Sequence, residues 1–169
     1  MIKRVVWAVV FIMIAALLQS TVFARLAVHI HAAPDLALDI LVFSAYVNGT
    51  MTGQLTGFFS GFLMDFLSAA PLGFNALVRT FVGALTGFIK GTFFLDIFFF
   101  PMALCAGATI FKALLYFALH LLFAGAVPSY NFFAPTFWVE MGLNTLLAPF
   151  LFAFLKLFES LLAGERENT

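Results

Sequence analysis

Apolar residues fill most of the chain in six runs, which short breaks rich in polar residues, glycine or proline separate. A helix needs about 20 mostly apolar residues to cross the hydrocarbon core of a bilayer. The pattern predicts six membrane-spanning helices, at Val5–Ala24, Asp35–Asn48, Thr52–Leu67, Phe74–Ile89, Ile97–Phe123 and Phe137–Leu157. Five spans are the main alternative, because the second run is the weakest. The first run is too long for a signal-peptide core and lacks a nearby A-x-A cleavage site, so it is expected to remain as a helix.

The composition agrees with this pattern. Of 169 residues, 64% are hydrophobic and 9% are charged, and the mean hydropathy is +1.11. A soluble domain needs a more polar exterior than this composition supplies. The sequence therefore predicts an all-α, polytopic membrane helix bundle in a lipid bilayer. We expect one integral membrane domain over residues 1–169, with a short cytoplasmic tail at 160–169.

The charges orient the bundle and exclude some partners. Cytoplasmic loops of membrane proteins carry an excess of Lys and Arg. With six spans and a cytoplasmic N-terminus, five basic residues lie inside, namely Lys3, Arg4, Lys90, Lys156 and Arg166. Only Arg25 lies outside, so both termini are predicted to be cytoplasmic. The net charge is zero, and no basic patch suited to nucleic acid is present.

Glycine recurs at every fourth position in the third and fourth runs. The positions are Gly53, Gly57 and Gly61 before Asp65, and Gly83, Gly87 and Gly91 after Arg79. Residues four apart share one face of a helix, and small residues let helices pack closely in lipid. A hairpin turning at Pro71–Gly73 would pair Gly61 with Gly83, Gly57 with Gly87, Gly53 with Gly91, and Asp65 with Arg79. We therefore predict an intramembrane ion pair between Asp65 and Arg79, made directly or through Asn75 or backbone.

Polar residues in the last two runs form two further stripes. Lys112, Tyr116 and His120 share one face, and Glu140 and Asn144 share another. A polar seam between these helices is favoured over a proton relay or a small-molecule pocket. A turn near residue 130 would set His120 level with Glu140. The lysine could snorkel, pair with an acid from another helix, or face a partner.

The sequence offers little evidence for metal binding or catalysis. His29 and His31 resemble a metal cluster only loosely, since their spacing is short and they lie in a loop. No C-x-x-C, H-E-x-x-H, G-x-S-x-G or phosphate-loop pattern occurs. We therefore expect no cofactor, no metal, no catalytic residues and no enzymatic activity.

Several of these features together resemble the MreD family of rod shape-determining membrane proteins. The resemblance covers residues 34–91 and rests on the stretches Pro34-Asp35-Leu36, Gly61-Phe-Leu-Met-Asp65 and Pro71-Leu-Gly73-Phe-Asn75-Ala-Leu77 and on the Gly83/Gly87 stripe. The last two helices match only in hydrophobic character. The resemblance therefore implies no role for Lys112, His120 or Glu140.

The resemblance implies a non-enzymatic scaffold of the cell-elongation (rod) complex in the bacterial cytoplasmic membrane. It implies binding to an MreC-like membrane protein and, through that protein, a link to the MreB filament, the RodA polymerase and its transpeptidase, which carry out lateral peptidoglycan synthesis. It also implies a fold similar to the substrate-binding subunits of energy-coupling-factor transporters. The alternative is a vitamin-type substrate-binding subunit of a transporter. Against that alternative, the first helix lacks an A-x-x-x-A surface for a transporter partner, since Ala8 is followed by Ile12.

Overall fold

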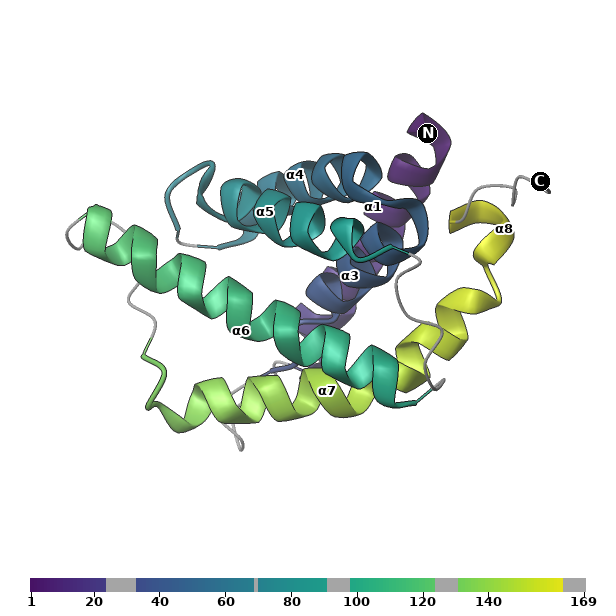
Figure 1. Ribbon diagram of the computed structural model, residues 1–169. Helices are drawn as coiled ribbons and strands as arrows, with labels where there is room; N and C mark the ends of the chain where they lie inside the picture. The colour runs from purple at the N-terminus through teal and green to yellow at the C-terminus, as the bar shows by residue number, and fades with distance from the viewer. Residues whose placement is uncertain (24–32, 69, 91–97, 124–130, 163–169) are drawn as a thin grey trace.

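The computed structural model describes residues 1–23, 33–68, 70–90, 98–123 and 131–162, and its regular structure in these ranges is helical (Figure 1). Six helices correspond to the six predicted runs: α1 (Ile2–Leu18), α3 (Leu36–Asn48), α4 (Thr50–Leu67), α5 (Phe74–Phe88), α6 (Phe99–Leu122) and α7 (Pro135–Lys156). A π-helical turn, η1 (Gln19–Phe23), continues α1, and a single turn, α8 (Glu159–Leu162), follows α7. The predicted all-α fold is confirmed for the described ranges.

Three helices are long and apolar enough to cross a membrane. They are α1 with the start of η1 (Ile2–Thr21), α6 and α7. Only 28% of each apolar window is buried inside the chain. Most of their apolar side chains therefore point outward, as expected for helices that contact lipid. The chain is accordingly a membrane protein.

The central helix of the bundle is α3, which is apolar but has only 13 residues. Every residue from Ala37 to Ala45 is buried. A helix that is apolar on all sides belongs in a core, and α3 contacts α1, α4, α5, α6 and α7. Figure 1 shows α4 and α5 side by side on one side of the molecule and α6 and α7 on the other.

Two glycines in left-handed backbone conformations divide this part of the chain into helices. Gly49 (φ 93°) ends α3 and begins α4, and Gly73 (φ 92°) precedes α5. Residues with a Cβ rarely adopt such φ values. At α7, Pro135 occupies the first helical turn, where its missing N–H costs no hydrogen bond.

The most extensive contact between two helices joins α4 and α5, and it runs through the glycines. A Cβ on Gly53 would overlap the backbone of Gly83, one on Gly57 the carbonyl of Arg79, and one on Gly61 the carbonyl of Asn75. Likewise, a Cβ on Gly87 would overlap the backbone of Gly49 and Thr50. Five of the six glycines therefore lie at this contact, and Gly91 is outside the described residues.

The expected pairing of the glycines is wrong in register. Gly57 lies beside Arg79 instead of Gly87, eight residues earlier in α5 (87 − 79 = 8), which is about two helical turns. The predicted pairing assumed a symmetric hairpin centred on Leu72. The facing ends of the two helices are as predicted, at Leu67 and Phe74, but the first turn of α5 lies beside Gly61. The connection thus turns back along the end of α4.

The last described turn, α8, packs on the bundle. Leu162 is fully buried, and its carbonyl oxygen accepts a hydrogen bond from Asn48 Nδ2 at 2.7 Å. The turn also contacts α1. Residues 160–162 of the expected tail therefore belong to the bundle, and residues 163–169 lie outside the described ranges.

Candidate functional site

The site is built around Asp35, which immediately precedes α3. Its Oδ1 accepts a hydrogen bond from the backbone N–H of Leu38 at 3.0 Å. Aspartate is among the residues favoured at this capping position, because the first N–H groups of a helix have no partner within the helix. The backbone N–H of Asp35 donates in turn to Oδ1 of Asn144 at 2.7 Å. These two bonds fix the carboxylate at the start of the central helix.

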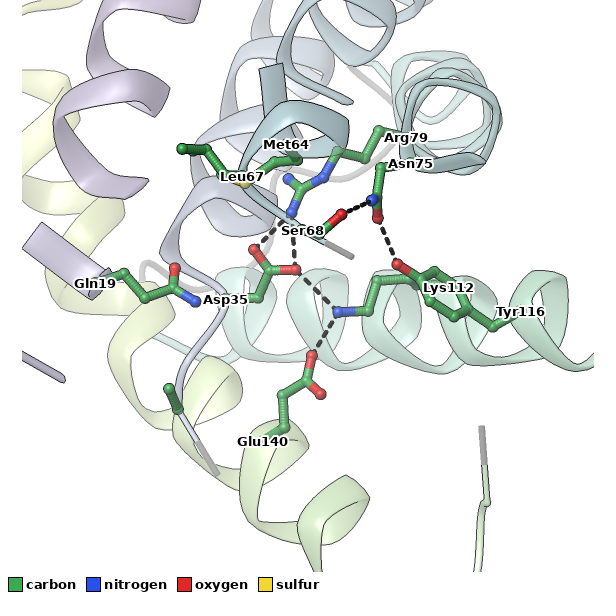
Figure 2. A pocket seen from close by; sticks show the side chains of 11 residues that line it. Gln19, Asp35, Met64, Leu67, Ser68, Asn75, Arg79, Lys112, Tyr116 and Glu140 are labelled. Carbon is green, nitrogen blue, oxygen red and sulfur yellow. Dashed lines mark hydrogen bonds and ion pairs between the residues drawn. The ribbon is translucent and has the colours of Figure 1, made fainter. Parts of the chain in front are cut away.

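Side chains from α5 and α6 contact this carboxylate, and a side chain from α7 joins them through Lys112 (Figure 2). Arg79 of α5 donates from Nη2 to both carboxylate oxygens, at 2.8 and 3.0 Å. Lys112 of α6 donates from Nζ to Oδ2 at 2.9 Å. The same ammonium group also donates to Oε1 of Glu140, on α7, at 2.5 Å. We call Asp35, Arg79, Lys112 and Glu140 the ion network.

The ion network is well buried. Relative exposure is 6% for the side chain of Arg79, 11% for Asp35, 8% for Lys112 and 16% for Glu140. Two acids face two bases, so the four formal charges cancel. In such surroundings the removal of one partner typically costs 3–5 kcal/mol, because an uncompensated buried charge remains. The network therefore fixes α3, α5, α6 and α7 relative to one another.

Asp65 has a different role from the one predicted. Its carboxylate accepts hydrogen bonds from the backbone N–H groups of Gly73 (2.8 Å), Asn75 (2.8 Å) and Ala76 (3.3 Å). The free N–H groups and the positive end of the helix dipole at the start of α5 satisfy this charge. The expected direct ion pair between Asp65 and Arg79 is therefore wrong, because Arg79 pairs with Asp35 instead. Of the expected indirect route from Asp65 to Arg79 through Asn75 or backbone, the described residues show the bond from the backbone N–H of Asn75 to Asp65.

A second polar chain lies next to the ion network. The hydroxyl of Tyr116 donates to Oδ1 of Asn75, and Nδ2 of Asn75 donates to Oγ of Ser68 at 3.2 Å. These contacts link α6 to the start of α5 and the end of α4. Of the positions that carry the family resemblance, Asp35, Gly73 and Asn75 thus all lie at or beside this site. Pro34 is buried next to Asp35 in the chain, whereas Pro71 is exposed.

A cavity of about 270 Å³ lies beside these groups. Its walls come from all six helices or the residues next to them: Gln19, Ala33, Asp35, Met64, Leu67, Ser68, Asn75, Arg79, Lys112, Tyr116 and Glu140. Eight of these eleven residues are polar or charged. The cavity is thus lined mainly by polar side chains (Figure 2), whereas many large apolar side chains are exposed on the outside of the bundle.

The polar stripes of α6 and α7 meet, but in a different register from the expected one. Glu140 contacts Lys112 instead of lying level with His120, and Nδ2 of Asn144 donates to the hydroxyl of Thr109 at 3.1 Å. Of the three alternatives for Lys112, pairing with an acid from another helix is the one observed. His29 and His31 lie outside the described residues.

Sequence reasoning missed the pairing of Asp35 with Arg79. Asp35 was noted only as a position of the family resemblance, and Arg79 was assigned to the nearer acid along the chain. The sequence nevertheless contained evidence that Asp35 lies close to a buried base. Lys112 lies deep in an apolar run and requires an acid, and Asp35 stands at the start of another run. An unassigned buried base is good evidence that a distant acid is close in space.

The fold and the site together define a helical membrane protein whose core is held by an ion network and by close glycine contacts. The family model of the rod shape-determining protein MreD matches residues 1–158. The chain therefore belongs to the MreD family, whose members are non-enzymatic, shape-determining membrane proteins. No curated protein and no solved structure matches it.

Proposed function

We propose that this chain is a scaffold of the bacterial cell-elongation (rod) complex and that it binds the membrane helix of an MreC-like partner. Its membership of the MreD family supports a part in rod shape determination. Through the partner, the scaffold would act together with the MreB filament, the RodA polymerase and its transpeptidase. Its contribution to lateral peptidoglycan synthesis would then be to position these proteins.

The rigidity of the bundle supports this proposal. The glycine contacts bring the backbones of α4 and α5 together, and the ion network joins α3, α5, α6 and α7. Binding costs less conformational entropy when a binding surface is already ordered. A bundle fixed in these two ways is well suited to hold another helix in one position.

The observation that carries the proposal is an apolar groove of about 560 Å³ between α1 and α4. Nine apolar side chains line it: Ile2, Val5, Val6, Val9, Val10, Leu55, Phe59, Phe62 and Leu63. The glycines of α4 and α5 already contact each other, so a partner needs another surface. Helices associate in lipid by close packing, and a groove gives a helix more contact than a flat face. We assign the partner's membrane helix to this groove.

The proposal includes a membrane topology. All six long helices would cross the cytoplasmic membrane, with both termini in the cytoplasm, in an architecture similar to energy-coupling-factor substrate-binding subunits. At 18 and 15 residues, α4 and α5 are short for spans. Their mutual contact and their contacts with α3 reduce the surface they present to lipid. Labelling of single cysteines placed near each helix end, from either side of the membrane, tests this topology.

Filling the groove tests the docking site. Val6 is 53% exposed in the groove, and Leu114 is 51% exposed on α6, outside it. We expect Val6→Trp to lower co-purification of the MreC-like partner at least tenfold, equivalent to about 1.4 kcal/mol, and to impair rod shape. The matched control, Leu114→Trp, should leave both unchanged. Full retention of the partner by Val6→Trp would place docking elsewhere, and no co-purification with the unaltered chain would refute the scaffold itself.

A further inference from the structure

The polar cavity is lined by buried hydrogen-bonding groups that have no partner among the described residues. Arg79 is 5% exposed. Its Nη2 donates to Asp35, whereas its Nε and Nη1 are buried and lack a hydrogen-bond partner within the described ranges. Oε1 of Gln19, which also lines the cavity, is likewise buried without a partner there. Leaving such groups unpaired costs about 1–3 kcal/mol each, and more for a charged group. Their presence around one cavity needs an explanation.

The position of Gln19 adds an independent observation. It is the first residue of η1, the π-helical turn that continues α1. Single π-helical turns are rare and occur frequently at functional sites. Figure 2 shows the Gln19 side chain directed toward Asp35 and the cavity. The π-helical turn thus begins with a residue whose amide lines the same cavity as the guanidinium group of Arg79.

We propose that this cavity binds a small zwitterionic group, with its anionic part at Arg79 and its amine at Gln19 and Glu140. A guanidinium group is a suitable donor to a phosphate or carboxylate. The amide oxygen and the carboxylate are suitable acceptors for an ammonium group. The ion network has no net formal charge, so it favours a ligand that carries both signs over a bare polyanion.

The volume limits the size of the ligand. About 270 Å³ equals roughly nine water molecules at about 30 Å³ each. Pockets for drug-sized ligands span about 300–1,000 Å³. This volume is sufficient for a phosphoethanolamine group. That group occurs in two sources, the head of phosphatidylethanolamine and soluble O-phosphoethanolamine.

Retention of lipid by the purified full-length chain tests the site. Native mass spectrometry from nanodiscs of mixed phosphatidylethanolamine and phosphatidylglycerol should show at least a tenfold preference for phosphatidylethanolamine. The preference should fall about three- to tenfold in Gln19→Leu, which removes one polar contact. Gln54→Leu makes the same chemical change on α4, away from the cavity walls, and should bind as the unaltered chain does.

A second arm separates the two sources. If the soluble group is the ligand, O-phosphoethanolamine raises the thermal midpoint of the detergent-purified chain, and Gln19→Leu reduces that rise. Absence of both the lipid preference and the thermal shift would overturn the proposal, as would identical binding by Gln19→Leu and Gln54→Leu. Co-purification of the MreC-like partner serves as a separate measurement, and we expect Gln19→Leu to leave it unchanged.

Discussion

The strongest test of the ion network is the substitution Asp35→Asn. Asparagine has nearly the same shape as aspartate and is equally good at a helix N-cap, so the hydrogen bond to Leu38 can persist. The change removes one negative charge from a balanced set of two acids and two bases. Lys112 keeps Glu140 as its partner, but Arg79 loses its ion-pair partner at 6% side-chain exposure. An uncompensated buried charge of this kind costs about 3–5 kcal/mol.

A double variant separates charge from shape. Arg79→Met combined with Asp35→Asn leaves Lys112 and Glu140 as a neutral pair. Replacement of a buried ion pair by neutral side chains of similar volume is often close to neutral. We therefore expect the double variant to recover more than half of the stability that Asp35→Asn loses. The matched control is Asp39→Asn, one turn further along α3, where the acid is fully buried and has no ion pair among the described residues.

The assay is unfolding of the purified chain in mixed micelles with increasing SDS. The fluorescence of Trp7 and Trp138 reports the transition. We expect a loss of about 3–5 kcal/mol for Asp35→Asn and of less than about 1 kcal/mol for Asp39→Asn. The reasoning is refuted if Asp35→Asn costs under about 1 kcal/mol, or if adding Arg79→Met makes the protein less stable still.

Three further predictions concern the contacts between helices. Gly57→Leu should abolish accumulation of folded protein in membranes, because even a Cβ overlaps backbone there, whereas Gly142→Leu, with open space around the Cβ position, should accumulate normally on immunoblots. Asp65→Ala should lower the free energy of unfolding by about 1–3 kcal/mol, because the first N–H groups of α5 lose their acceptor. A double-mutant cycle with Arg79→Met should give a coupling energy below about 0.5 kcal/mol. A coupling energy above about 2 kcal/mol would instead indicate a direct ion pair between Asp65 and Arg79. Glu140→Gln should cost less than Asp35→Asn in the SDS assay, because its lysine partner keeps Asp35; an equal or larger loss would show that α7 contributes the dominant charge.

Helix positions could be predicted from the sequence because they depend on local properties. Apolar run length, Gly49 and Gly73 at the turns, and glycine at every fourth position all act within a few residues. These features correctly indicated six helices and a close contact between α4 and α5. The predicted register was wrong because it depends on the path of the connection between the two helices. Asp65 binds the first amides of α5, and this local bond sets how far the connection turns back.

The ion network was not predicted from the sequence, for a different reason. Asp35 and Arg79 are 44 residues apart, and their pairing requires α3 to lie between α4, α5 and α7. No periodicity in either helix records that arrangement. Charge balance within the core was the one relevant sign, since each intramembrane base requires an acid. Two bases and several acids lie in the apolar runs, and choosing the acid nearer to Arg79 along the chain gave the wrong partner.

The bond between Asn48 and the carbonyl oxygen of Leu162 has a consequence for biogenesis. Asn48 is synthesised more than a hundred residues before Leu162. Until α8 has been made, the side-chain amide of Asn48 lacks this acceptor, and the surface that Leu162 covers remains exposed. A chain that ends at residue 156 keeps the six longer helices but loses this bond and the buried side chain of Leu162. We expect such a chain to be less stable than one that includes α8.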